Sequence, residues 1–146
     1  MTFQLPEGDT PFAQSVRRRV HEEYLAWFTA VGRHGMPQPA PIWFLWDETA
    51  LNFLVYNQTH ARRLDLVRQH PQTALHFDGY GTGSGIIVFT GHTQISIDEP
   101  PAHQHPLYLA KYSHWMTSKF GSPEQFAADY SVALRFYPDK VRGSSA

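Results

Sequence analysis

The chain has 146 residues, a formal charge of −1, and nearly equal numbers of basic and acidic side chains. This length favours one domain over residues 1–146 with its own core, and the balanced charge argues against a nucleic-acid-binding module. The chain contains no cysteine, which excludes disulfides, zinc–thiolate sites and a cysteine nucleophile. No apolar run reaches the roughly 18 residues of a membrane span, and the first residues lack a signal-peptide pattern. We therefore expect a cytoplasmic protein with no membrane partner.

The first part of the chain predicts a helical segment over residues 1–22 followed by strands. A helix over 11–23 has Asp9 or Thr10 as its N-cap and Pro11 at its first position. Two apolar runs, 24–31 and 36–47, flank the turn signal GRHG and predict a hairpin. Prolines alternate at positions 37, 39 and 41, and since proline donates no ladder hydrogen bond, this strand belongs at a sheet edge. The alternating run 50–57 predicts the next strand.

The rest of the chain predicts three more strands and three helices. Residues 60–70 form a short helix that Pro71 ends, and 72–80 and 86–97 form strands around a flexible glycine-rich loop. Gly91 inside the long strand 86–97 indicates a bulge or bend. Helices follow over 107–120 and 122–130, the second with Ser122 and Gln125 in a capping box. The last strand is 131–141. Six mostly hairpin-linked strands favour a mainly β fold, a six-stranded antiparallel barrel over 23–143 with inserted helices.

Two arginines occupy an unusual position at the start of the 60–70 helix. Arg62 and Arg63 fall in its first turn, where the helix dipole already carries partial positive charge and acidic residues are preferred. One interpretation is a pair of solvated surface arginines. The other is an anion site, because backbone N–H groups at a helix N-terminus and guanidinium groups both bind phosphate.

Several motifs in one order resemble a known family, the pyridoxamine 5′-phosphate oxidase-like split barrels, and within it the branch of F420-dependent oxidoreductases. The resemblance spans about residues 24–143. Two positions depart from the branch pattern: Arg63 replaces a lysine and Leu66 replaces an asparagine. The motifs are Gly35 and Pro37 before PIWFLWD (41–47), RLDLVRQHP (63–71), QTALHFDGYG (72–81), YLAKY (108–112) and VRG (141–143).

The resemblance implies an FMN-binding split barrel that transfers a hydride between bound F420 or FMN and a small electron-poor substrate. It also implies a homodimer, with the 36–57 hairpin at or beside the two-fold interface. No catalytic residue and no metal site are identified. The cofactor-binding residues it implies are Trp43, Asn57, Gln58, Thr59, Arg62, Arg63, His76 and Lys111.

Two alternatives remain open from the sequence. The chain shows no obvious acid–base residue, which is compatible with a non-catalytic flavin-binding protein. Related folds also handle haem, for which His76, His92 or His114 would be the candidate axial ligand.

Overall fold

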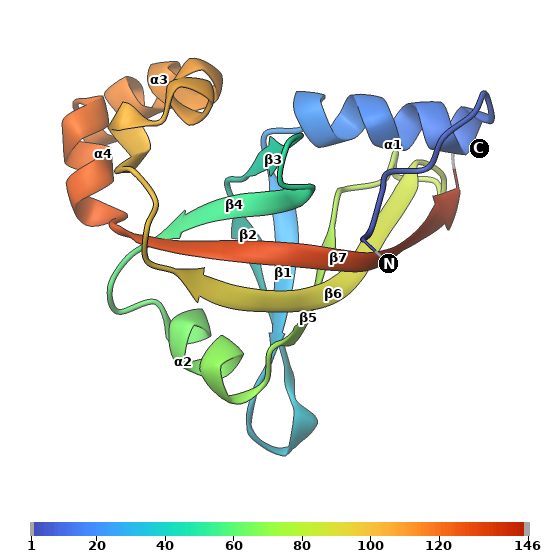
Figure 1. Cartoon of the computed structure of the whole chain (residues 1–146), viewed down its shortest axis with the longest axis horizontal. Helices are drawn as coiled ribbons and strands as arrows, with labels where there is room; N and C mark the ends of the chain where they lie inside the picture. The colour runs from blue at the N-terminus through green and yellow to red at the C-terminus, as the bar shows by residue number, and fades with distance from the viewer. Residues whose placement is uncertain (1, 145–146) are drawn as a thin grey trace.

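A single curled antiparallel sheet forms the body of the protein, as Figure 1 shows. The computed structural model describes residues 2–144. Its sheet has seven strands in the order β2-β1-β5-β6-β7-β4-β3, and all the pairings are antiparallel. The strands are β1 Ala26–Val31, β2 Pro37–Ile42, β3 Leu45–Asp47, β4 Asn52–Asn57, β5 Gln72–His76, β6 Ile86–Ser96 and β7 Val132–Ser144.

Within residues 2–144, four α-helices surround this sheet, and the starts of two of them follow from local capping chemistry. Thr10 accepts a hydrogen bond from the N–H of Ala13 and caps the first helix, while Ser122 accepts one from Gln125 and caps the fourth. The reciprocal bond of the expected capping box, from the N–H of Ser122 to the side chain of Gln125, does not form within residues 2–144, and Nε2 of Gln125 donates to Asp129. The helices are α1 Pro11–Glu22, α2 Arg62–Gln69, α3 Pro106–Phe120 and α4 Pro123–Asp129, with short 3₁₀ turns η1 Arg33–Gly35 and η2 Ala102–Gln104.

The expected strand 36–47 is wrong as a single element, which is why the sheet has seven strands and not six. It breaks at Trp43 and Phe44 into β2 and β3, which lie at opposite edges of the sheet. Only these two residues separate the two edges along the chain. The curled sheet is therefore closed at this point by the chain itself and is open elsewhere, which is the geometry of a split barrel.

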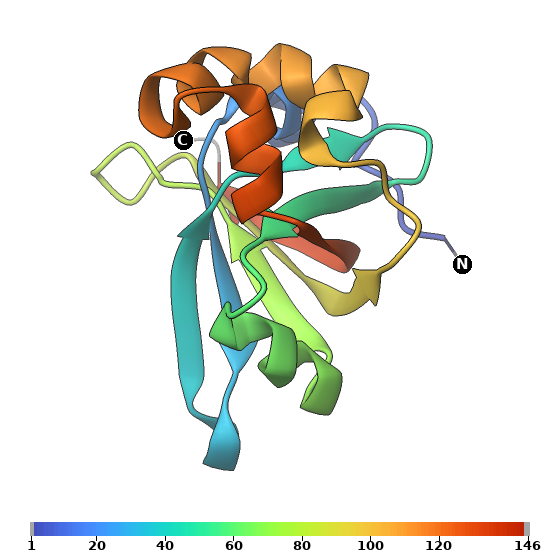
Figure 2. The ribbon, with the colours of Figure 1, turned by 90° about the vertical axis from the view of Figure 1, so that its left-hand side faces the viewer.

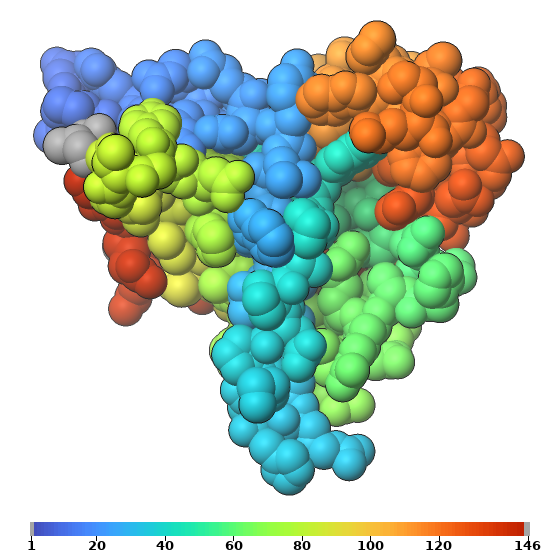
Figure 3. All heavy atoms as spheres, turned by 180° about the vertical axis from the view of Figure 1, so that it is seen from behind, coloured from blue at the N-terminus to red at the C-terminus, as the bar shows by residue number. Residues whose placement is uncertain are grey.

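The prediction that the proline-rich strand is an edge strand is confirmed. β2 pairs with β1 alone, and Pro37, Pro39 and Pro41 are all exposed. The β1–β2 hairpin projects away from the rest of the fold, as seen in Figures 2 and 3. Proline has no N–H to donate, so the free edge of β2 pairs poorly with a further strand.

Two hydrophobic clusters share the sheet, one on each face. The first fills the inside of the barrel and includes Phe28, Phe44, Phe53, Phe89 and Phe136. The second packs α3 and α4 against the outside of the sheet; its buried members are Leu54, Tyr56, Ala102, Tyr108, Tyr112, Met116, Phe126, Ala127 and Ala133.

This second cluster corrects the expectation that β4 alternates between buried and exposed residues. All six residues of β4 are buried, since Phe53 and Val55 point into the barrel while Leu54 and Tyr56 contact the helical layer. The interior is filled by side chains, as expected for a small barrel. A ligand-sized cavity must therefore lie outside it.

Gly91 marks an irregularity in β6, as the sequence predicts. The register between β6 and β7 shifts at Thr90/Gly91. A Cβ at position 91 would lie 2.0 Å from the carbonyl oxygen of Tyr137, so only glycine allows this approach. Among residues 2–144, no helix is both long and apolar enough to cross a membrane.

Candidate functional site

A cavity of about 320 Å³ lies where β2, α2 and the α3–α4 layer meet. Two of its lining side chains, Arg63 and Lys119, are cationic, and none is acidic. Most of the others are aromatic or apolar. Such a lining fits a flat ligand that carries negative charge. The full lining is Leu25, Pro41, Ile42, Trp43, Tyr56, Arg63, Lys119, Phe120, Phe126 and Tyr130.

Stacked aromatic rings form one wall of this cavity. Trp43 is stacked between Tyr112, at 4.7 Å between ring centroids, and Phe126, at 5.1 Å. Phe126 in turn stacks on Tyr130 at 4.6 Å and 7°. Phe120 meets Trp43 edge-on at 6.1 Å. Because each ring is held by its neighbours, the geometry of this wall is largely preformed.

The first turn of α2 supplies the polar side of the cavity. The helix begins at Arg62, and its N-cap residue Ala61 has no side chain that could accept from the first backbone N–H groups. The prediction that both arginines lie in this first turn is confirmed. Asp65 is the acidic residue of this turn, and it pairs with Arg68 at 3.0 Å. The helix thus begins without a side-chain cap and beside two arginines, although the N–H of Leu64 donates to the carbonyl of Ala61 at 3.1 Å.

Arg63 and Asn57 are in direct contact at this end of the cavity. The Nε of Arg63 donates to Oδ1 of Asn57 at 2.5 Å. Asn57 is fully buried, and its Nδ2 donates to the carbonyls of Val55 and Val132. Burial lowers the pKa of Arg63, although an arginine side chain stays protonated in proteins.

The structure brings some of the sequence-predicted residues together. Trp43 and Arg63 line the same cavity, and Asn57 touches Arg63. Gln58 and Thr59 lie in the connection from β4 to α2, next in the chain to these residues. Arg62 is exposed, and its side chain has no hydrogen bond or ion pair within the described part of the chain.

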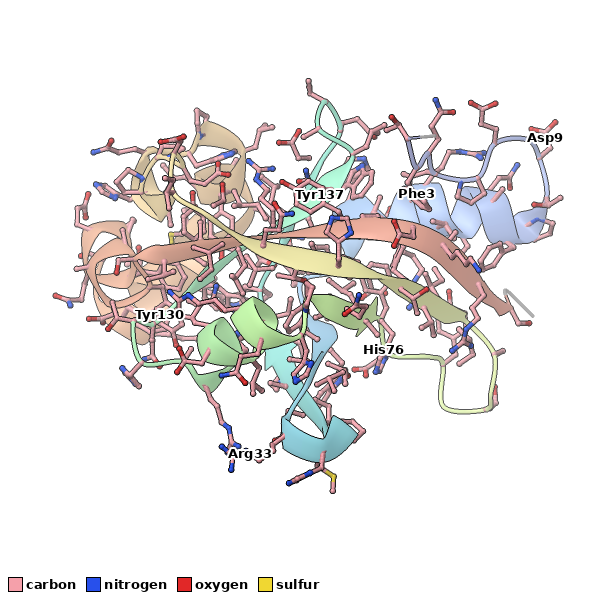
Figure 4. The ribbon with its side chains drawn as sticks, turned by 60° about the horizontal axis from the view of Figure 1, so that its bottom comes forward. Phe3, Asp9, Arg33, His76, Tyr130 and Tyr137 are labelled. Carbon is pink, nitrogen blue, oxygen red and sulfur yellow. The ribbon has the colours of Figure 1, made fainter. Side chains whose placement is uncertain are left out.

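Lys111 and His76 lie elsewhere. The Nζ of Lys111 donates to the carbonyl of Phe44 at 2.8 Å and sits 3.8 Å from the centroid of the Phe44 ring. Burial lowers the pKa of Lys111 to about 7. His76 is on β5, with Nδ1 3.2 Å from the carbonyl of Phe77. Figure 4 shows His76 well apart from Tyr130, which lines the cavity.

Several cavity residues were missed by the sequence reasoning. Lys119, Phe120, Phe126 and Tyr130 come from α3, α4 and the junction with β7. The only sequence signal was the density of aromatic residues around the α3–α4 turn. That density is equally typical of a packed helix pair, so it did not single these residues out.

The histidines considered for haem do not converge on the cavity. None of the ten lining residues is a histidine. His92 stacks on Tyr137 at 5.1 Å, and His114 is exposed on α3. Within residues 2–144, no cluster of three or more His, Cys, Asp or Glu side chains is suited to holding a metal ion.

Comparisons with known proteins place this fold in a wider context. A family model described as pyridoxamine 5′-phosphate oxidase matches residues 12–145. No curated protein matches the chain.

Three solved structures illustrate the likeness. An F420 reductase is 17% identical, with a TM-score of 0.65, and the alignment covers 86% of this chain and 94% of that one. An FAD-binding protein from Mesorhizobium loti is 15% identical, with a TM-score of 0.61, and the alignment covers 88% of this chain and 89% of that one. The haem-storage protein HutZ from Vibrio cholerae is 13% identical, with a TM-score of 0.60, and the alignment covers 89% of this chain and 92% of that one. At these identities the likeness is one of fold.

Proposed function

The chain belongs to the pyridoxamine 5′-phosphate oxidase family, and from this premise we propose that it is an oxidoreductase with a flavin-type cofactor. The cofactor is FMN or the deazaflavin F420, and it binds in the cavity between β2, α2 and the α3–α4 layer. The second substrate is a small, electron-poor molecule that exchanges a hydride with the cofactor.

The observation that carries the proposal is the lining of this cavity. A stacked aromatic wall around Trp43 stands beside two cationic side chains, Arg63 and Lys119, with no acidic side chain among the lining residues. FMN and F420 both combine a flat ring system with a phosphate. An aromatic wall suits the ring, and cationic donors suit the phosphate.

The uncapped start of α2 supports the same assignment. An anion there would accept from the first backbone N–H groups and from Arg63, and it would offset the repulsion between the arginines and the helix dipole. The phosphate group therefore fits the residues that are present. Gln58 and Thr59 lie close enough in the chain to add neutral donors.

The hydride chemistry would be supplied by the bound ring itself. The protein residues bind, orient and shield: Arg63 holds the charged group, Trp43 contributes to the aromatic wall, and the apolar side chains of Leu25 and Ile42 exclude water. The lining contains no carboxylate and no histidine, so no general base is assigned. A non-catalytic flavin-binding protein is the alternative, and a test for turnover separates the two. Haem is less well supported, because no cavity residue is a histidine.

We further propose that the working form is a homodimer. Tyr24 and Leu25 are large apolar side chains with exposed fractions of 47% and 42%, and Leu25 lines the cavity. A second subunit would cover them and complete the site. Light scattering on the purified protein at micromolar concentration should give twice the chain mass. A monomer at this concentration would contradict the proposal.

Binding of FMN, riboflavin and F420 to the purified apo protein tests the proposed cofactor. We expect FMN or F420 to bind and to quench tryptophan fluorescence, since Trp43 lines the cavity. Arg63→Ala should weaken binding of the phosphate-bearing ligand about ten- to a hundredfold, the value of a charge-assisted hydrogen bond of roughly 1.5–3 kcal/mol. Arg68→Ala is the matched control, because Arg68 is on the same helix but does not line this cavity.

Turnover is measured separately, as reoxidation of the reduced cofactor by a nitroaromatic or quinone acceptor. Failure of all three ligands to bind would overturn the cofactor assignment. Tight binding without acceptor-dependent reoxidation would favour the non-catalytic alternative.

A further inference from the structure

The geometry points to Asn57 as a positioning residue that holds the guanidinium of Arg63 in the orientation needed to bind the ligand's anionic group. This inference rests on the proposed function, because it concerns the same cavity. Asn57 does not touch the ligand in this arrangement. It acts on the ligand only through Arg63.

The amide of Asn57 has no donor left for a ligand. Its Nδ2 carries two hydrogens, and these go to the carbonyl oxygens of Val55, at 3.0 Å, and Val132, at 3.1 Å. Its Oδ1 accepts from Arg63. The reversed amide would set Nδ2 against the guanidinium and Oδ1 against two carbonyls, so the orientation is determined by the network.

The position of Asn57 is also rigid. It is the last residue of β4, it pairs with Val132 on β7, and none of its surface is exposed. A buried amide with both hydrogens bonded to strand carbonyls has one arrangement at low energy. Oδ1 therefore projects from the sheet as a fixed acceptor towards the start of α2.

The Oδ1 of Asn57 fixes the orientation of the Arg63 side chain. The guanidinium is planar, so fixing Nε restricts where the two Nη groups point. Neither Nη group has a hydrogen-bond partner among residues 2–144, and Arg63 lines the cavity. The Nη edge is thus free to bind two oxygens of a phosphate at once. Without Asn57 the long side chain would sample other rotamers, and binding would have to order it.

A double-mutant cycle with two ligands tests this inference. FMN and riboflavin differ by the phosphate, so the ratio of their dissociation constants isolates the anion contact. Asn57→Ala should lower the preference for FMN about three- to tenfold, as expected for one lost orienting hydrogen bond. In the Arg63→Ala background the same change should alter the preference less than about twofold, because the residue it orients is gone.

The outcomes separate this inference from the proposed function. If Arg63→Ala leaves the FMN preference unchanged, both the phosphate site and the role of Asn57 are overturned. If Arg63→Ala removes the preference but Asn57→Ala does not, only the positioning role is overturned. An equal loss of FMN and riboflavin affinity in Asn57→Ala would show a merely structural role and would also overturn it.

A measurement on the unmutated apo protein covers the case in which Asn57→Ala does not fold. The Nε–H of Arg63, assigned by its absence in Arg63→Lys, should give a slowly exchanging signal in a ¹⁵N-correlated NMR spectrum. The exposed Arg62 provides the fast-exchanging reference. An Arg63 Nε–H that exchanges as fast as that of Arg62 would contradict a fixed bond to Asn57.

Discussion

The hydroxyl of Tyr112 on α3 binds both backbone polar groups of Phe44, the residue at which the chain passes from one sheet edge to the other. It accepts from the N–H of Phe44 at 2.9 Å, and its hydrogen is shared between the carbonyls of Phe44, at 3.0 Å, and Tyr24, at 2.7 Å. The break between β2 and β3 leaves Phe44 outside any ladder. The hydroxyl of Tyr112 thus supplies the partner of the Phe44 N–H, while the Phe44 carbonyl also accepts from Nζ of Lys111 on the same helix.

Tyr112→Phe should destabilise the fold by about 1–3 kcal/mol, because it leaves the buried N–H of Phe44 without a partner. Urea denaturation followed by circular dichroism measures this loss. Tyr108→Phe is the matched control: Tyr108 is equally buried on the same helix, and its hydroxyl has no hydrogen-bond partner among residues 2–144. We expect Tyr108→Phe to be neutral or slightly stabilising. Equal losses in the two variants would mean that the hydroxyl of Tyr112 adds nothing specific.

Arg63→Lys should restore only part of the FMN affinity that Arg63→Ala removes. Lysine keeps the charge but lacks the planar fork, and it offers Asn57 no Nε–H. Arg62→Ala should have the smaller effect of the two alanine substitutions, since Arg62 is exposed and unpaired within residues 2–144. Isothermal titration ranks the variants. A larger loss for Arg62→Ala than for Arg63→Ala would move the anion contact to the outer arginine.

Glu99 should contribute to stability only while it is ionised. The hydrogen bond from Arg135 lowers the pKa of Glu99 below its ordinary value of 4.5, and Arg135 also binds Asp47. A carboxyl whose folded pKa is lowered stabilises the fold above the unfolded pKa and loses this effect as the pH falls through the folded pKa.

Glu99→Gln should therefore flatten the decline in stability below about pH 4.5, while costing stability at pH 7. Thermal melts from pH 3 to 7 measure both. The matched control is Glu124→Gln, because Glu124 is exposed on α4. If the decline in stability at low pH is unchanged in Glu99→Gln, the ion pair between Glu99 and Arg135 has no role in it.

The buried Lys111 should make the stability of the fold depend on pH in the alkaline range. Burial lowers the pKa of Lys111 to about 7 from its model-compound value of 10.5. Between these two values the unfolded chain binds more protons than the folded one, so stability should rise with pH across that window. Lys111→Met should remove this rise, although the Phe44 carbonyl then keeps only Tyr112. Denaturation at pH 7 and 9.5 tests it, with the exposed Lys119→Met as the control. If stability still rises between pH 7 and 9.5 in Lys111→Met, the rise comes from another group.

Much of the local structure could be read from the sequence because its determinants are close in the chain. Thr10 and Ser122 cap helices within three residues of themselves, and alternating prolines mark β2 as an edge through the donors they lack. Gly91 identified the bulge, since only glycine permits that approach of two strands. The unusual pair Arg62–Arg63 identified the polar end of the candidate site, because a charge pattern at a helix start needs only the sequence to be recognised.

The tertiary structure decided what depends on distant neighbours. The break at Trp43–Phe44 arises because the sheet curls until its two edges meet, which no local pattern encodes. The resemblance implies that Asn57 binds the cofactor, but Val132, 75 residues later, takes one of its amide hydrogens. Lys119 and Phe126 reach the cavity only because α3 and α4 fold back over the outside of β4. Sequence alone thus specified which elements form and where charge collects, while long-range packing determined which side chains face one another across the site.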